Sequence, residues 1–140
     1  MVGQTGKVYA VDVYEKEIDA LEKEIEKKGI RNIVALVADM TKSMPIDDGV
    51  VDVCIMVNVL HGIVANGEID DVMREVVRVV KPGGALGIVD FKREEGAHGP
   101  PMHVRLSPGK AQELVTRFHF RKKELHDIGP SHYLMIINKL

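Results

Sequence analysis

The chain has 140 residues, within the usual range of one domain, and its 45% hydrophobic and 29% charged residues form an ordinary globular mixture rather than a disordered one. Its formal net charge of -2 gives no attraction to nucleic acid or to an anionic membrane surface, which favours a small-molecule or protein partner. A single cysteine excludes an intramolecular disulfide, and no apolar stretch approaches the ~20 residues that span a bilayer, so we expect a cytoplasmic location.

The first third of the chain predicts a strand, a helix and a second strand. Apolar and β-branched residues from Lys7 to Val13 predict a strand that ends at Asp12. An amphipathic helix follows, with apolar residues at helical spacing: Ile18, Leu21 and Ile25. Gly29 stands where a helix ends, and the apolar run from Asn32 to Ala38, closed by Asp39, predicts the next strand.

The middle of the chain predicts two more strands around a helix. Val51 to Val57 is almost continuously apolar, which is typical of a central strand covered on both faces in a parallel sheet. From Glu68 an apolar stripe at helical spacing predicts a helix that packs on the sheet: Ile69, Val72, Met73, Val76, Val77 and Val80. That helix ends at the turn Lys81 to Gly84, and Ala85 to Phe91 predicts the fourth strand.

The last third begins with a polar loop that extends to Leu106 and is too long to be a simple connection. The loop contains several residues that disfavour regular structure: Gly96, Gly99, Pro100 and Pro101. Ser107 and Pro108 form an N-cap and a first-turn proline for a short helix. Phe120 to Ile128 and Tyr133 to Asn138 then predict an antiparallel hairpin.

This order predicts a single α/β domain over residues 1–140, with a mainly parallel sheet, helices on both faces and a C-terminal antiparallel hairpin. Ligands of such sheets bind at the carboxyl ends of the strands. There Asp12 could accept hydrogen bonds from two ribose hydroxyls, or simply start the helix. Asp39 could accept from the amino group of adenine while Met40 covers the ring, or simply start a loop.

Several segments in this order together resemble a known family: Lys7 to Val13, Val37 to Met40, Val51 to His61, Arg78 to Gly84, Pro100 to Pro108, and Gly129 to Tyr133. They are similar to class I S-adenosylmethionine-dependent methyltransferases, especially the quinone-biosynthesis type. The resemblance implies a Rossmann-like fold, S-adenosylmethionine as cofactor and methyl transfer to a small-molecule acceptor.

The resemblance also implies roles for particular residues. The cofactor-binding positions are Asp12, Val13, Asp39, Met40, Asn58 and Val59. His61 is the candidate catalytic base because it follows a strand end and can titrate near neutrality, although a structural histidine fits equally well. His103 and Arg105 are candidate substrate contacts, Arg105 toward an anionic group. No metal is expected, because no two histidines have the spacing of a helical pair and Cys54 has no partner cysteine.

One part of the family pattern is absent. In the family, a strand with an acidic, glycine-rich loop precedes the strand at Lys7 to Val13, and that loop wraps the methionine part of the cofactor. Gly3 to Lys7 aligns with the connection just before the second strand of the family, so we interpret it as a turn. It is no P-loop, because Val8 stands where Ser or Thr should follow the lysine. The missing strand would lie between Lys7 to Val13 and Val51 to Val57.

A late start codon, a fragment, or strand exchange with another copy in a homo-oligomer would each explain that absence. Two other functions therefore stay open besides methyl transfer. The first is a non-catalytic or partner-binding module without a complete cofactor site. The second is a dinucleotide-dependent dehydrogenase, which would need the same glycine loop.

Overall fold

The computed structural model describes residues 2–95 and 98–140, so Gly96 of the predicted loop lies outside the described residues. The chain divides into two compact units, Met1–Pro45 and Ile46–Leu140. The single-domain organisation predicted for residues 1–140 stays a prediction. No helix among the described residues is long and apolar enough to cross a membrane.

The Met1–Pro45 unit is a strand, a helix and a strand, as predicted. β1 (Val8–Asp12) and β2 (Ile33–Val37) are parallel, and α1 (Glu15–Lys28) connects them and packs on both. The helix ends because Gly29 adopts a left-handed conformation with φ 61°, which lets its N–H donate to the carbonyl of Glu26. The predicted cap is therefore confirmed.

The glycine-containing segment before β1 is a turn, which confirms its interpretation from sequence. The Asn32 side-chain amide donates to the carbonyl oxygens of Gly3 and Gly6, each at 3.1 Å. Asn32 directly precedes β2, and its own carbonyl accepts the Val8 N–H at 2.8 Å. These bonds fix the turn at the amino end of β1, whereas Asp12 lies at the carboxyl end of the same strand.

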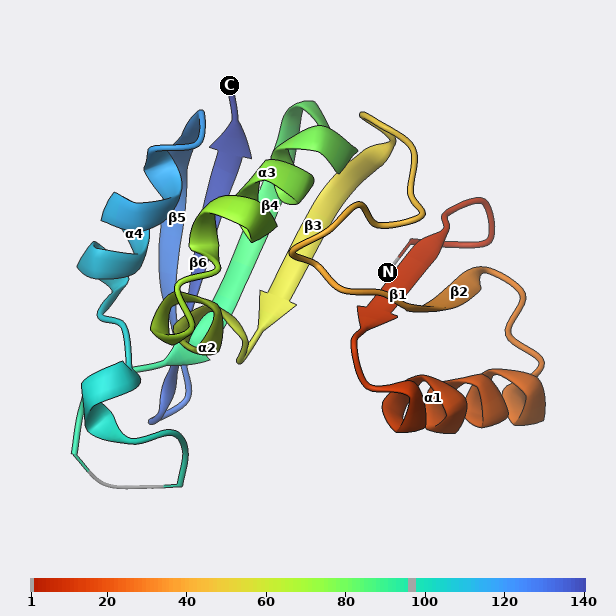
Figure 1. Cartoon of the computed structure of the whole chain (residues 1–140), viewed down its shortest axis with the longest axis horizontal. Coiled ribbons are helices and arrows are strands. Elements are labelled where there is room, and N and C mark those ends of the chain that lie inside the picture. Colours follow the sequence, from red (N-terminus) through yellow and green to blue (C-terminus); the bar gives the residue numbers. More distant parts are fainter. Residues whose placement is uncertain (1, 96–97) are drawn as a thin grey trace. The chain divides into compact units, whose positions relative to one another are not determined.

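The Ile46–Leu140 unit holds a four-stranded sheet in the order β3-β4-β6-β5 (Figure 1). Its elements are β3 (Val51–Val57), α2 (Leu60–Ala65), α3 (Ile69–Val79), β4 (Val80–Phe91), the 3-10 helix η1 (Met102–Val104), α4 (Pro108–Thr116), β5 (Phe120–Ile128) and β6 (His132–Lys139). β3 and β4 are parallel, and β6 is antiparallel to both β4 and β5. The α/β class and the terminal hairpin are confirmed.

The core of this unit lies between one face of the sheet and helices α2, α3 and α4 (Figure 1). Side chains from both layers are completely buried there: Leu60, Met73, Leu86, Ile88, Met135 and Ile137. Ser107 caps α4 as predicted, since its hydroxyl accepts the Lys110 N–H at 3.2 Å.

Within the Ile46–Leu140 unit, β3 is an edge strand and not the expected central strand covered on both faces. β3 pairs with β4 alone and forms an edge of its sheet. Met56 is buried beneath the helices, but Val53, Ile55 and Val57 on the opposite face are 58%, 65% and 53% exposed. An apolar run indicates which surface a strand can bury, not whether a covering element is present.

The turn before the main part of β4 depends on the close approach of Gly84 to the backbone. Val51 pairs with Val80 and Val53 with Ala85, so the residues between Val80 and Ala85 bulge from the ladder. A Cβ atom on Gly84 would lie 2.9 Å from the Lys81 carbonyl oxygen and 3.0 Å from that of Asp52. Only glycine fits this position without displacing backbone atoms.

We therefore expect Gly84→Ala to lower the free energy of unfolding by about 2 kcal/mol through overpacking. Chemical denaturation followed by circular dichroism measures the change. Gly109→Ala is the control, because Gly109 lies in the first turn of α4 with open space around its Cβ position. That substitution should be neutral or stabilising by up to about 1 kcal/mol. Equal effects of the two substitutions would contradict the close-approach explanation.

Candidate functional site

Two predicted acidic residues lie at the same edge of the β1–β2 sheet. Asp12 ends β1, and its carbonyl accepts the Ala38 N–H at 3.0 Å, which brings Asp39 next to the end of that strand. The Asp12 Oδ1 atom accepts the Tyr14 N–H at 2.9 Å. The Asp39 Oδ1 atom accepts the Thr41 hydroxyl at 2.6 Å and the Thr41 N–H at 2.9 Å.

These contacts agree with both interpretations of the two acids. Each carboxylate stabilises the turn that follows its strand, as a helix-start or loop-start residue does. The hydroxyl and N–H of Thr41, in that order, lower the pKa of Asp39, so this group stays an anionic acceptor at neutral pH. A carboxylate has several acceptor positions, so a turn bond does not prevent it from binding a ligand.

The residues of this edge fit one half of the implied cofactor. Val13 is exposed and Met40 half-buried beside the two carboxylates, which gives acceptors for ribose and adenine next to apolar side chains. The Gly3 to Gly6 turn lies at the opposite end of β1 and cannot wrap a ligand here. Within residues 2–45 the structure thus places carboxylate acceptors and apolar side chains at this edge, and no glycine-rich loop lies beside them.

In the other unit, a partly buried histidine and a buried aspartate form a pair at the carboxyl ends of β3 and β4. The His61 Nδ1 atom lies 2.7 Å from Asp90 Oδ1, and the His61 backbone N–H donates to Asp90 Oδ2 at 3.0 Å. Asp90 Oδ1 also accepts the Phe91 N–H at 2.8 Å. The His61 side chain is 16% exposed and that of Asp90 only 1%. The predicted candidate base therefore has a carboxylate partner that the sequence interpretation did not include.

An aromatic and polar layer surrounds this pair. The Phe91 ring meets His61 edge-on, with centroids 6.1 Å apart, and lies 4.2 Å from the His132 ring. His132 Nε2 lies 3.0 Å from Asn58 Oδ1, which can only accept, so Nε2 donates and Nδ1 of the neutral ring accepts the Ser131 hydroxyl at 2.8 Å. Asn58 adopts a left-handed conformation with φ 56°. The predicted cofactor residue Asn58 is thus joined to the strand that begins at His132, and Val59 after it is exposed at the start of α2.

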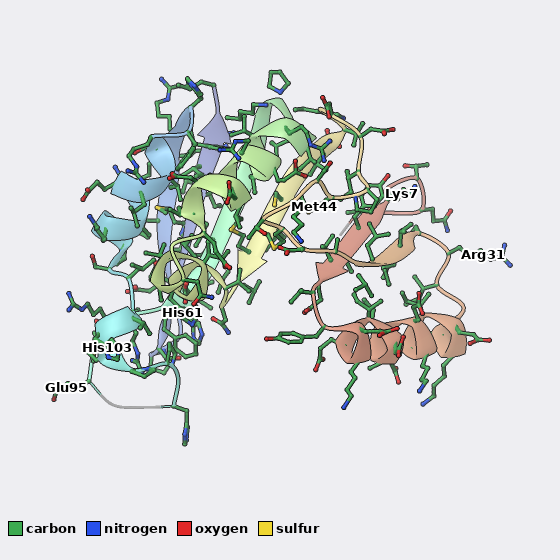
Figure 2. All side chains as sticks on the ribbon, in the orientation of Figure 1. Lys7, Arg31, Met44, His61, Glu95 and His103 are labelled. Atoms are coloured by element: carbon green, nitrogen blue, oxygen red, sulfur yellow. The ribbon has the colours of Figure 1, made fainter. Side chains whose placement is uncertain are left out.

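The two predicted substrate contacts differ in their surroundings. The Arg105 guanidinium donates to the carbonyls of Pro100 and Glu94, at 2.9 and 3.0 Å, and lies over the Phe91 ring. These bonds favour a structural role in holding the loop. His103 is exposed on η1, which packs against the helix that carries His61 (Figure 2). The substrate roles of both residues stay predictions.

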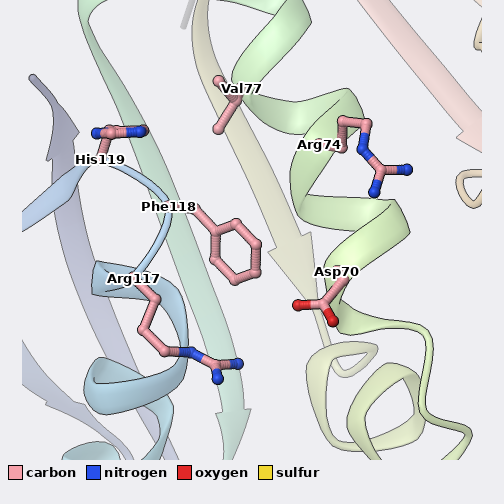
Figure 3. A pocket seen from close by; sticks show the side chains of 6 residues that line it. All are labelled: Asp70, Arg74, Val77, Arg117, Phe118 and His119. Carbon is pink, nitrogen blue, oxygen red and sulfur yellow. The ribbon is translucent and has the colours of Figure 1, made fainter.

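A pocket of about 390 Å³ lies elsewhere in this unit, and none of the predicted residues line it (Figure 3). Its walls come from α3 and the α4–β5 connection: Asp70, Arg74, Val77, Arg117, Phe118 and His119. Phe120 pairs with Lys139, and the preceding residue of β6, Asn138, pairs with Ala85, so this pocket lies toward the opposite end of β4 from Asp90.

Two other chemistries find little support in the described residues. No group of three or more His, Cys, Asp or Glu side chains among residues 2–95 and 98–140 is arranged to hold a metal ion. Burial raises the pKa of the Cys54 thiol to about 11, so it stays protonated at neutral pH and is a poor nucleophile.

Comparison with known proteins adds a family and a fold. A family model described as a methyltransferase domain matches residues 1–88. The ubiquinone/menaquinone biosynthesis C-methyltransferase UbiE of Escherichia fergusonii is 30% identical over 93 residues, which are 66% of this chain and 36% of that protein. The chain thus spans little more than a third of the length of this curated relative.

Solved structures agree with this family. A SAM-dependent methyltransferase from Aquifex aeolicus is similar with a TM-score of 0.90 and 27% identity. The match covers 100% of this chain and 72% of the Aquifex chain. The cyclase SpnF has a TM-score of 0.79 at 15% identity. The match covers 98% of this chain and 67% of the SpnF chain. At that identity the cyclase shows a common fold alone.

Proposed function

The chain belongs to the methyltransferase-domain family whose model matches residues 1–88, and we propose that it acts in transferring a methyl group from S-adenosylmethionine to a small-molecule acceptor. The observation that carries this proposal is the position of Asp12 and Asp39 at one edge of the β1–β2 sheet. Both acids lie within the residues that the family model matches.

The proposal gives the candidate residues of each unit a limited task. When bound, the cofactor supplies a methyl group already activated on a sulfonium. Asp12 accepts hydrogen bonds from the ribose hydroxyls, and the anionic Asp39 accepts from the adenine amino group. His61 takes a proton where the acceptor must lose one. The protein otherwise contributes orientation and exclusion of water, which is why no fixed catalytic motif is needed.

A second function is favoured by the position of the glycine turn. Gly3 to Gly6 lies at the amino end of β1, so within residues 2–45 no glycine-rich loop lies beside the acceptors around Asp12. The alternative is a methyltransferase-like module that binds a partner and transfers no methyl group. The fold does not by itself require methyl transfer, since a protein named a cyclase shares it.

Calorimetric titration of the chain with S-adenosylmethionine and S-adenosylhomocysteine separates the two functions. Under the leading proposal, we expect saturable binding of both compounds with one site per chain. Light scattering at the same protein concentrations gives the oligomeric state. Binding that appears only in a dimer would support completion of the sheet by a second copy. Absence of saturable binding in every state would contradict the enzyme proposal for this chain and favour the module.

A further inference from the structure

Asp90 is held rigidly where it meets His61. It lies on β4 within the ladder to β6, where it pairs directly with Tyr133, and its side chain is buried. Its two oxygens accept three N–H groups: the backbone N–H groups of His61 and Phe91, and Nδ1–H of the His61 ring. The backbone bonds fix the carboxylate independently of the imidazole. Asp90 is therefore in place to accept Nδ1–H whether the His61 ring is neutral or protonated.

This arrangement determines which ring nitrogen of His61 carries the hydrogen. An ionised carboxylate can only accept, so the 2.7 Å contact requires the hydrogen on Nδ1. In the neutral ring, Nε2 then keeps its lone pair. Nε2 has no hydrogen-bond partner among residues 2–95 and 98–140. The pair thus presents a free acceptor nitrogen at the carboxyl end of the sheet.

Among the described residues, the other polar groups near this pair do not bond to the His61 ring as Asp90 does. Burial and the charge of Asp90 raise the pKa of Tyr133, so the phenol stays neutral. Its buried hydroxyl has no hydrogen-bond partner among the described atoms. His132 uses both ring nitrogens on Ser131 and Asn58. The Arg105 guanidinium lies over the ring of Phe91, the residue after Asp90, and donates to a loop carbonyl.

We infer that Asp90 is a positioning residue that holds His61 as a base whose Nε2 removes a proton from the methyl acceptor. This inference rests on the proposed function and narrows its substrate class to acceptors whose reacting oxygen, nitrogen or carbon bears a hydrogen. The bond to that hydrogen breaks as its electron pair forms the new bond to the methyl carbon. The methyl–sulfur electron pair stays on sulfur, and the proton goes to Nε2, where Asp90 stabilises the imidazolium.

Nitrogen-15 NMR of histidine-labelled protein without cofactor tests the tautomer. In mildly alkaline solution we expect the Nδ1–H form of His61 to exceed the Nε2–H form by roughly tenfold or more, as a charge-assisted bond implies. His61→Gln assigns the signal. Asp90→Asn should abolish most of that excess. Glu124→Gln is the control, because it removes an exposed carboxylate that lies 2.8 Å from Nε2 of another histidine, His126, and should leave the His61 tautomer unchanged.

Acylation by diethyl pyrocarbonate tests whether Nε2 is available as a base, which a merely structural histidine would not require. We expect modification of His61 at Nε2, about tenfold slower in Asp90→Asn, with the exposed His103 modified at an unchanged rate. An Nε2–H tautomer, or an unreactive His61 in the unmodified protein, would overturn the inference even if Asp90→Asn fails to fold. Neither measurement uses cofactor, so their outcome is independent of whether S-adenosylmethionine binds.

Discussion

Replacing Arg78 with alanine is expected to lower the free energy of unfolding of the Ile46–Leu140 unit by about 3 kcal/mol. This value is near the lower end of the losses that follow when one partner of a buried ion pair is removed. The Arg78 guanidinium donates through Nε and Nη2 to both oxygens of Glu75, at 2.7 and 2.8 Å. Its Nη1 donates to the Ile46 carbonyl at 2.7 Å and to Asp48 at 2.6 Å. Since Glu75 is only 8% exposed, the substitution leaves a buried carboxylate without this fork.

Chemical denaturation measures this loss, and Arg74→Ala provides the control. Arg74 lies one turn earlier on α3 and contacts Asp71 at 2.9 Å, but both side chains are exposed. Its replacement should change the free energy of unfolding by less than about 1 kcal/mol. Arg78→Lys should fall between the two, because an ammonium keeps the charge and loses the planar fork. Similar losses for Arg78→Ala and Arg74→Ala would show that the buried fork contributes little.

Elements with strong local signals could be predicted from the sequence. These signals come from residues that are neighbours in the sequence. They include the apolar pattern of β1 and α1, the helix end at Gly29 and the N-cap at Ser107. Helix α2 was missed because it has six residues and no side-chain cap. A helix that short is stabilised by packing rather than by its own sequence, as the complete burial of Leu60 indicates.

The positions of the candidate residues were predictable where they depend on strand ends. Asp12, Asp39 and His61 each follow an apolar run, and the structure places them at the carboxyl ends of strands. The partners of His61 were not predictable in the same way. Asp90 lies 29 residues away and meets it only because β3 and β4 pair in parallel. Its one sequence signal was an acid within an apolar strand, which requires a polar partner when buried.

The Asp12 substitutions have the largest expected effect on binding. In protein that binds S-adenosylhomocysteine, Asp12→Ala should weaken affinity by roughly a hundredfold, because two ribose hydroxyls lose a charged acceptor. Alanine also removes the bond from the Tyr14 N–H, which connects β1 to α1. Asp12→Asn separates the two effects, since the asparagine side-chain oxygen can still accept that N–H while the negative charge is gone.

Calorimetric affinities of the two variants then locate the ribose. If Asp12 binds the hydroxyls, Asp12→Asn should weaken affinity by roughly tenfold although the turn is kept, because a neutral amide is a weaker acceptor. Asp19→Asn, an exposed change on α1 in the same unit, should leave affinity unchanged. Circular dichroism checks that α1 stays folded. Loss of affinity with alanine alone would assign Asp12 to the turn, and unchanged affinity in both variants would refute the placement of the cofactor at this strand end.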